Sequence, residues 1–399
     1  MSLTYQYYFV NKSYPPPRDI YLNNAATSWP KPESVIRAVR DHLLAMPGES
    51  GRSTDELTLD PVQKARETVG EFFGCENPDN LIFTSGATQS LNMLIHGFAA
   101  GQGSQFHAIT TDLDHNSVLR PLTTLADQRR ITLSIIPSRD GYVHPADVRD
   151  EIKDDTRLLV INQGSNVIGT VQKIQEIHAV LKGTGIFLLV DGSQTAGQIP
   201  IDLSRLGADA FVFTGHKYLF GMPGTGGFWI RDPEAVQPIM QGGTGTNSAD
   251  LRQPAMLPER YEAGTPNYPG IISLEAGVTY IQETGFDRIV DHQKRCINAF
   301  YEPLKDSDSM IRYHPSPDIP VFAVNIKGMD PDTAGFVLRT TYGIITRTGL
   351  HCAPLIHNQI TAGKGCVRLS PSLLTDPADC QYAGEVLATL GKQVRASGM

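Results

Sequence analysis

The stretch that decides the fold is FVFTGHKYLFGMPGTGGFWI, residues 211–230. It begins and ends with apolar runs of the kind that form buried β-strands. Between the runs lies Lys217, and five glycines occur between residues 215 and 227. Because glycine lets a backbone turn tightly and approach a ligand closely, we predict a strand, a tight loop that carries the lysine, and a second strand.

Around this stretch, short β-rich runs alternate with amphipathic helical patterns from about residue 80 to residue 230. We predict strands at residues 80–84, 106–111, 131–137, 157–162, 186–191, 209–214 and 226–230. Helices are expected at residues 88–99, 117–129, 145–153 and 173–182. Such alternation is typical of βαβ units, so the prediction is an α/β fold with a mostly parallel, seven-stranded sheet.

The pattern changes after a passage rich in glycine, threonine and proline at residues 241–270. Long helical segments follow up to about residue 305, then strand-like runs at 320–326 and 365–371, and a closing helix near 377–395. We therefore predict a large α/β domain at residues 20–270 and a smaller α+β domain at residues 271–399, joined by the N-terminal tail 1–19.

The composition narrows the function classes. A net charge of −8, with 40% hydrophobic and 19% charged residues, is that of an ordinary globular protein. It offers no basic stripe for nucleic acid and no polybasic segment for a membrane surface. Without a long apolar run or the layout of a signal peptide, we expect a cytoplasmic protein that acts on small molecules or proteins.

The cysteine pattern argues against structural cross-links. The five cysteines are scattered and include no C-x-x-C pair. This pattern favours neither a disulfide framework nor a zinc site, and we expect no metal.

Polar residues gather just after the predicted strands, at Ser85, His115, Asn166, Asp191 and Lys217. In open α/β sheets, ligands bind beyond the carboxyl ends of the strands. We therefore expect these positions, far apart in sequence, to converge in one candidate site.

Lys217 is a candidate reagent. Loss of solvent lowers the pKa of a lysine amine, and the neutral amine can form a Schiff base or act as a general base. Asp191 ends the preceding predicted strand, where a carboxylate can keep the ring nitrogen of pyridoxal 5′-phosphate protonated. Gln194 is a neutral donor suited to the phenolic oxygen of such a ring. Taken alone, Asp191 is explained equally well as a helix cap.

A phosphate site is expected at the start of the helix after residue 85. Gly86, Ala87 and Thr88 open that helix, and the N–H groups of a helix N-terminus bind anions. Thr214 and His216 can reach the same phosphate from the lysine loop. His115 is either a capping residue or a ring that stacks on a planar cofactor and moves protons.

Eight motifs, read in order, resemble one family. They are YLNNAAT, SGATQSLN, DHNS, SNVIGT, VDGSQTAG, TGHK, EAGTPN and RTGLHCAP, and the similarity runs from residue 20 to residue 375. They resemble the class-V aminotransferases, which are pyridoxal-phosphate-dependent enzymes of fold type I, and within them the cysteine desulfurases and selenocysteine lyases.

The resemblance implies a role for each matching position. Lys217 would carry the cofactor, Asp191 would hold its ring nitrogen, and His115 would stack on the ring and take part in catalysis. The other implied cofactor contacts are Gly86, Ala87, Thr88, Asn166, Gln194, Thr214, His216 and Thr265. Asn166, Arg347 and Arg368 would bind the substrate. Thr265 would come from a neighbouring subunit, which implies a homodimer.

Cys352, in TRTGLHCAPLIH (residues 346–357), separates functions within the family. Arg347, His351 and His357 lie nearby in sequence, and positive neighbours favour a nucleophilic thiolate; a buried inert cysteine is the alternative. The resemblance implies a desulfurase that converts L-cysteine to L-alanine, forms a persulfide on Cys352 and passes sulfur to a thiol or an acceptor protein.

Other functions remain open, namely an aminotransferase, a selenocysteine lyase or a non-catalytic sulfur-assembly scaffold. Two positions also depart from the family pattern. Leu350 stands where many of these enzymes have a first histidine of a pair, and Ala87 replaces a common threonine. Neither change removes a required group.

Overall fold

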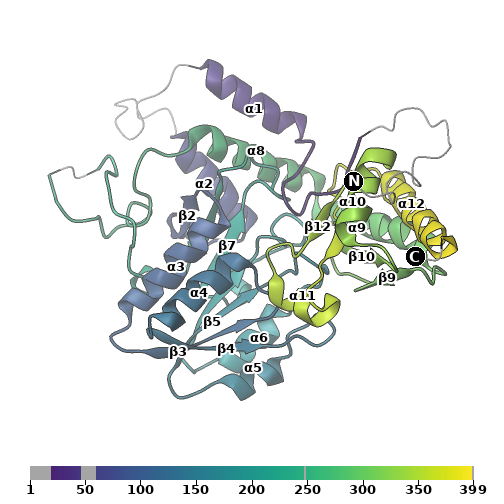
Figure 1. Ribbon diagram of the computed structural model, residues 1–399. Coiled ribbons are helices and arrows are strands. Elements are labelled where there is room, and N and C mark those ends of the chain that lie inside the picture. Colours follow the sequence, from purple (N-terminus) through teal and green to yellow (C-terminus); the bar gives the residue numbers. More distant parts are fainter. Residues whose placement is uncertain (1–18, 46–59, 247–248, 398–399) are drawn as a thin grey trace.

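The large sheet of the computed structural model has seven strands in the order β2-β8-β7-β6-β5-β3-β4 (Figure 1). The structure describes residues 19–45, 60–246 and 249–397. The strands are β2 (Leu81–Thr84), β3 (Phe106–Thr111), β4 (Ile131–Ile136), β5 (Thr156–Asn162), β6 (Phe187–Asp191), β7 (Ala210–Thr214) and β8 (Gly226–Ile230). Of the seven strands, β8 alone has the reversed direction, antiparallel to both β2 and β7. This confirms the predicted mostly parallel sheet and all seven predicted strands.

Helices cover both faces of this sheet. The helices of the large part are α1 (Glu33–Leu44), α2 (Pro61–Phe72), α3 (Ala87–Gly101), α4 (Asn116–Asp127), α5 (Pro145–Glu151), α6 (Ile174–Leu181), α7 (Leu203–Leu206) and α8 (Tyr268–Thr284), of which α1 packs on α8. The four predicted helices correspond to α3, α4, α5 and α6. In β7 the side chains alternate, as the pleat of a strand requires. Phe211 and Phe213 pack with α2, whereas Ala210 and Val212 pack with α3 and α4.

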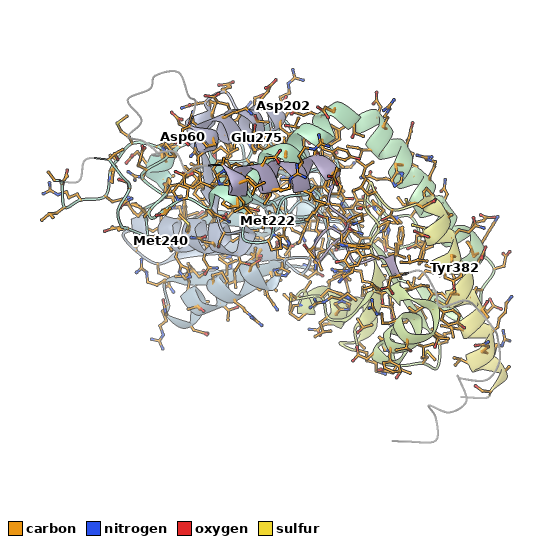
Figure 2. The ribbon with its side chains drawn as sticks, turned by 90° about the horizontal axis from the view of Figure 1, so that it is seen from above. Asp60, Asp202, Met222, Met240, Glu275 and Tyr382 are labelled. Carbon is orange, nitrogen blue, oxygen red and sulfur yellow. The ribbon has the colours of Figure 1, made fainter. Side chains whose placement is uncertain are left out.

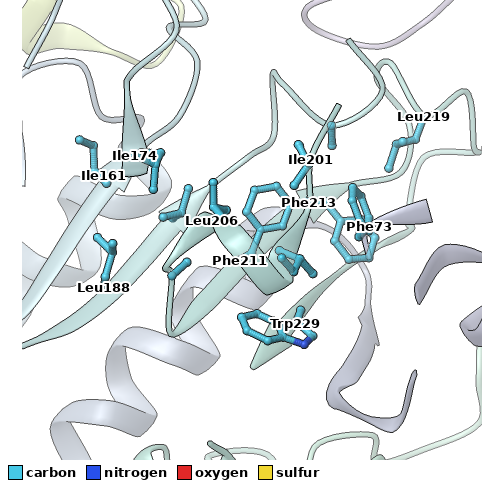
Figure 3. Packing of buried hydrophobic residues seen from close by; sticks show 14 of the residues in the cluster. Phe73, Ile161, Ile174, Leu188, Ile201, Leu206, Phe211, Phe213, Leu219 and Trp229 are labelled. Atoms are coloured by element: carbon cyan, nitrogen blue, oxygen red, sulfur yellow. The ribbon is translucent and has the colours of Figure 1, made fainter. Parts of the chain in front are cut away.

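Aromatic packing anchors β7, the strand that leads into the lysine loop. The ring of Phe73 lies 5.6 Å from that of Phe211 and 5.2 Å from that of Phe213, centroid to centroid (Figure 3). All three side chains are fully buried. Burial of a phenylalanine contributes about 1.5–3 kcal/mol to folding, so the end of β7 is a rigid base for the loop that follows.

The C-terminal part has its own antiparallel sheet, ordered β12-β13-β10-β9. Its strands are β9 (Met310–Arg312), β10 (Phe322–Ile326), β12 (Arg347–Gly349) and β13 (Cys366–Leu369), and its helices are α9 (Phe286–Tyr301), α10 (Pro331–Tyr342), α11 (Pro354–Thr361) and α12 (Pro377–Ala396). A separate parallel pair joins β1 (Ile20–Tyr21) to β11 (Ile344–Ile345). Met240 of the large part and Tyr382 of α12 lie at opposite ends of the molecule (Figure 2).

The predicted boundary between the two domains, at residues 270 and 271, falls inside α8. Apolar side chains of α8, such as Leu274 and Val278, belong to the core of the large sheet. A boundary after α8 is therefore our proposal. The predicted role of the N-terminal tail lies outside the described residues, except for Asp19. Among the described helices, none is both long and apolar enough to span a bilayer.

Candidate active site

A cavity of about 340 Å³ lies beyond the carboxyl ends of the large-sheet strands, closed on one side by the C-terminal part. Cavities of this size are typical of small-molecule sites. The predicted site residues that line it are Gly86, Ala87, Thr88, His115, Asn166, Asp191, Gln194, Thr214, His216, Lys217, Arg347, Cys352 and Arg368. The structure thus brings thirteen of the fourteen predicted residues together. The exception is Thr265, an exposed residue that does not line the cavity of its own chain.

The loop that carries Lys217 is held by the N-terminal segment. The carbonyl oxygen of His216 accepts hydrogen bonds from Ser28 N (2.9 Å), Thr27 Oγ1 (3.1 Å) and Lys31 Nζ (3.2 Å). Lys31 Nζ also donates to the carbonyl of Gly221, at 2.6 Å. The loop is therefore bound at both ends, by a lysine that lies 185 positions before His216 in the sequence.

Helix α8 supports the same loop from behind. At Gly277, an added Cβ would lie 2.0 Å from the carbonyl oxygen of Leu219. Only glycine allows this approach of helix to loop, because real Cβ atoms do not come so close to a backbone oxygen. The main chain after Lys217 therefore rests directly on the backbone of α8.

Burial lowers the pKa of Lys217 from 10.5 to about 8, and the nearby cation of Arg368 acts in the same direction. The negative charge of Asp191 opposes this shift. A substantial fraction of the amine is therefore neutral near physiological pH. A neutral amine is the form that attacks an aldehyde or accepts a proton.

The carboxylate of Asp191 is buried and oriented by Ser193. Oδ1 of Asp191 accepts a hydrogen bond from the main-chain N–H of Ser193 at 2.9 Å and another from its hydroxyl at 2.5 Å. Nearby, Gln194 donates through Nε2 to the carbonyl of Ala25, at 3.1 Å. This bond uses one of the two Nε2 protons, so Gln194 keeps a donor for a ligand.

The predicted anion site lies at the first turn of α3. Gly86 is the N-cap residue with φ of +144°, a backbone conformation that favours glycine. An added Cβ at Gly226 would lie 2.8 Å from the Cα of Gly86, so β8 also needs glycine to pass this turn. Burial lowers the pKa of His216 to about 4, with a smaller contribution from Lys217. His216 is therefore a neutral ring beside the turn.

His115 has the predicted capping role, and its ring also lines the cavity. It is the N-cap of α4, and its Nδ1 accepts a hydrogen bond from Ser117 N at 3.1 Å. The proton of the neutral ring is therefore on Nε2. Burial and the charge of Lys217 lower the pKa of His115 to about 4. The ring is thus uncharged and lines the cavity in one defined orientation.

Arg368 is buried and positioned by main-chain and side-chain acceptors. It donates to the carbonyl of Asn166 at 2.9 Å and to Oδ1 of Asn23 at 3.2 Å. Burial lowers the pKa of Arg368 from 12.5 to about 10, so it remains a cation. Arg347 pairs with it across β12 and β13, but Arg347 is exposed. Two guanidinium groups therefore lie at this wall of the cavity.

Cys352 is the exposed cysteine among the five. Its main-chain carbonyl accepts a hydrogen bond from Asn116 N at 2.7 Å, and the carbonyl of His351 accepts one from Asn166 Nδ2 at 2.7 Å.

The expectation that His351 and His357 supply positive charge is wrong. Burial lowers the pKa of His351 well below its ordinary value and that of His357 to about 4, so both rings are neutral.

Sequence reasoning missed several residues that shape the site. Ala25 and Ala26 line the cavity within the motif YLNNAAT, which was identified but given no role. Ser193, which orients Asp191, lies in the motif VDGSQTAG. Lys31 could not be identified from sequence, because nothing in the sequence distinguishes a lysine that donates to carbonyl groups from a solvated surface lysine.

Comparison with known proteins decides the family. The model of the family "Aminotransferase class-V" matches residues 20–382. The chain belongs to the class-V aminotransferase family. This confirms the resemblance found in the motifs, and members of this family depend on pyridoxal 5′-phosphate.

Two relatives of this class-V protein are similar along most of their length. A probable cysteine desulfurase of Methanothermobacter thermautotrophicus is 29% identical over 95% of this chain and 96% of its own. A cysteine desulfurase of Yersinia pseudotuberculosis is 31% identical over 84% of each chain. Among solved structures, the apo cysteine desulfurase of Thermococcus onnurineus superposes with a TM-score of 0.86 at 26% identity, over 94% of this chain and 95% of its own. The fold predicted from sequence is therefore confirmed.

The cavity of this class-V protein fits the cofactor of its family. Buried polar atoms without a hydrogen-bond partner among the described residues include Oε1 of Gln194, Oδ1 of Asn166, Nδ1 of His216 and Nε of Arg368. Unpartnered buried polar atoms are costly, and all four residues line the cavity. The site therefore matches a polar ligand with three groups. An anionic group matches the turn at Gly86, a basic ring nitrogen matches the carboxylate of Asp191, and an aldehyde matches the amine of Lys217.

Proposed function

We propose that this protein is a pyridoxal 5′-phosphate-dependent cysteine desulfurase, which converts L-cysteine into L-alanine and retains the sulfur on Cys352. The observation that carries the proposal is a shared cavity, which Lys217 and the exposed Cys352 both line. Amino-group transfer requires no thiol, whereas a sulfur transfer that leaves alanine requires a thiol to receive the sulfur. The similarity to cysteine desulfurases over most of the chain supports the same function.

When bound, pyridoxal 5′-phosphate supplies an electron sink for bond breaking in the substrate amino acid. In our proposal, the first turn of α3 holds its phosphate and Asp191 keeps its ring nitrogen protonated. Lys217 would hold the cofactor through its amine, and the free amine would accept the proton of the substrate Cα. Arg368 binds the substrate carboxylate, for which a guanidinium offers two parallel donors.

The sulfur step belongs to Cys352. Its sulfur forms a bond to the sulfur of L-cysteine while the carbon–sulfur bond of the substrate breaks. The electron pair of that bond goes to the substrate carbon, which gains a proton, and alanine leaves. The balance is L-cysteine plus a protein thiol giving L-alanine plus a protein persulfide, so no external oxidant is needed. A small thiol or an acceptor protein then removes the sulfur.

We further propose that the enzyme acts as a homodimer. Thr265 lies in the motif EAGTPN but is exposed and away from the cavity of its own chain. A partner subunit that presents Thr265 to the phosphate site explains both facts. Sedimentation of the purified protein tests the dimer, and Thr265→Ala is expected to weaken cofactor retention.

The purified enzyme tests the activity with L-cysteine and dithiothreitol, with alanine and sulfide measured together. We expect Cys352→Ala to lose alanine formation by about a hundredfold or more, because the nucleophile is gone, while the yellow absorbance of the cofactor remains. Lys217→Ala is expected to lose the chromophore that borohydride reduces. A wild-type rate of alanine formation in Cys352→Ala would refute the assignment of the nucleophile. Amino transfer to a keto acid without alanine release would instead identify an aminotransferase.

A further inference from the structure

Two buried histidines lie beneath the loop that carries Cys352. Nδ1 of His351 is 3.1 Å from Nε2 of His357, and the ring centroids are 5.3 Å apart. His351 is 5% exposed and His357 is fully buried. Neither ring is used by the proposed chemistry, so their hydrogen bond needs another explanation.

The partners of the two rings define where the protons are. Nε2 of His351 lies 3.2 Å from the main-chain carbonyl of Arg347, which can only accept, so this nitrogen carries the proton. Nδ1 of His351 then accepts from Nε2 of His357. On the far side, Nδ1 of His357 lies 3.3 Å from the hydroxyl of Thr361. Burial keeps both rings neutral. The carbonyl of Arg347 fixes the tautomer of His351, whose Nδ1 is then an acceptor for His357.

The turn above this pair is conformationally strained. His351 and Cys352 have φ of +51° and +56°, a region that residues with a Cβ rarely adopt. Two consecutive residues of this kind persist only when the surroundings hold them. The main chain is held by Asn166 and Asn116, but the side chain of His351 is held by His357 and by the carbonyl of Arg347.

Helix α11, which carries His357, is itself fixed to the large part of the molecule (Figure 1). Nε2 of Gln359 donates to the carbonyl of Ser138, in the loop after β4, at 2.7 Å. His357 is therefore a fixed point, and the hydrogen bond to His351 transmits that position to the turn.

A metal site is the competing explanation, since the sulfur of Cys366 lies within 4.8 Å of ligand atoms of both histidines. Three facts argue against it. The facing nitrogens of the rings already bond to each other. Burial raises the pKa of Cys366 to about 12, so it is a thiol rather than the thiolate that binds metals. The cation of Arg368 is also close enough to influence His351, His357 and Cys366.

We propose that His357 is a positioning residue, which holds the strained turn at His351 and Cys352 through its hydrogen bond to His351 and thereby directs the Cys352 thiol into the cavity. The expected effect on sulfur transfer rests on the proposed function. The position of the thiol can be measured without it.

The test compares His357→Leu, which lacks a donor, with His357→Gln, whose amide can donate, in the cofactor-loaded enzyme. We expect His357→Leu to lower the kcat for alanine formation by about tenfold with little change in KM, because misplacement of a reacting group costs rate. The spectral change of the cofactor on addition of L-cysteine should remain, and His357→Gln should recover most of the rate.

A second readout does not depend on desulfurase activity. The rate at which iodoacetamide alkylates Cys352, followed by peptide mass spectrometry, should change by about fivefold in His357→Leu and return toward wild type in His357→Gln. His292→Leu is the matched control, because His292 is a partly buried histidine of α9 that bonds to Cys296 away from the cavity. It should leave both rates unchanged.

Three outcomes would overturn the proposal. The first is an unchanged kcat and alkylation rate in His357→Leu. The second is an equal loss of both in His357→Gln and His357→Leu at matched melting temperature. The third is stoichiometric zinc in the purified protein that disappears in His357→Gln. If His357→Leu does not fold, His357→Asn replaces it, because its shorter side chain holds the amide farther from Nδ1 of His351 than that of His357→Gln. If the wild type makes no alanine, the proposed function fails, and the alkylation rates still decide the positioning.

Discussion

The main-chain N–H of Asn116 donates a hydrogen bond of 2.7 Å to the carbonyl oxygen of Cys352. Asn116 is the first residue of α4, where N–H groups have no partner within the helix. The bond therefore joins the large part of the molecule to the cysteine loop of the C-terminal part and satisfies a helix terminus at the same time.

Asn116→Pro tests this bond with little other change. Proline is favoured at the first position of a helix and lacks only the N–H, and His115 already has the extended conformation that a following proline requires. Because one hydrogen bond contributes about 0.5–1.5 kcal/mol, we expect the rate of alanine formation to fall about twofold to tenfold. Asn116→Ala keeps the N–H and should match wild type. Equal rates in both variants would show that the bond has no role in positioning Cys352.

The lowered pKa of Lys217 predicts how cofactor uptake depends on pH. The neutral amine attacks the aldehyde, so a pKa of about 8 instead of 10.5 makes the reactive form available at lower pH. The rate at which cofactor-free protein regains absorbance with pyridoxal 5′-phosphate should rise up to about pH 8 and then level off. A rate that continues to rise toward pH 10 would mean that the amine is solvated like an ordinary lysine.

Arg368 and Arg347 should differ in their effect on substrate binding. Arg368 is 3% exposed and held by two hydrogen bonds, whereas Arg347 is exposed. Lysine cannot reproduce the bidentate fork of a buried guanidinium, so Arg368→Lys should lower kcat/KM for L-cysteine by roughly tenfold to a hundredfold. Arg347→Lys should cost much less, because an exposed charge is screened by solvent. Initial rates over a range of L-cysteine concentrations measure both variants.

Gly277→Ala is expected to destabilise the protein. Alanine normally favours a helix over glycine by about 1 kcal/mol, but here its Cβ would lie 2.0 Å from a backbone carbonyl oxygen, which cannot rotate away. Overpacking of this kind costs about 1–3 kcal/mol, so the steric term exceeds the helix propensity. Thermal unfolding should show a lower melting temperature and weaker cofactor retention.

The control for this substitution is Gly103→Ala, at which an added Cβ would meet no atom within 4 Å. Its melting temperature should equal or slightly exceed that of wild type. If Gly277→Ala and Gly103→Ala behave alike, the contact between α8 and the lysine loop is not tight.

The large sheet could be predicted from sequence because its strands are apolar runs bounded by glycine and polar residues. Part of the candidate site could be predicted because the ends of parallel strands meet at one edge of a sheet. Arg347 and Arg368, on the smaller sheet, were implied only by the family resemblance. Helix α11 is not among the predicted elements, although its first residues lie in the cysteine motif. Helices α1 and α2 were also missed. Their apolar faces are buried only by packing with α8 and the sheet, which the sequence does not show.

The contacts that hold the cysteine loop have no sequence signal. The donor of Asn116 and the acceptor of Cys352 are main-chain groups that nearly every residue carries. The neutral state of His351 and His357 was likewise hidden, because burial sets their pKa values and burial depends on the whole fold. Sequence therefore identified which residues meet, but not their charges or the bonds that orient them.

Both carbonyl groups of the turn at residues 351 and 352 are bound to the large part of the molecule. In our proposal, a sulfur atom held on this cysteine can therefore travel only as far as one side chain rotates, because the turn itself is held in place. In the proposed reaction, delivery depends on the recipient, whose thiol must enter the mouth of the cavity. A slender molecule or a protruding loop meets that requirement, whereas a flat protein surface does not.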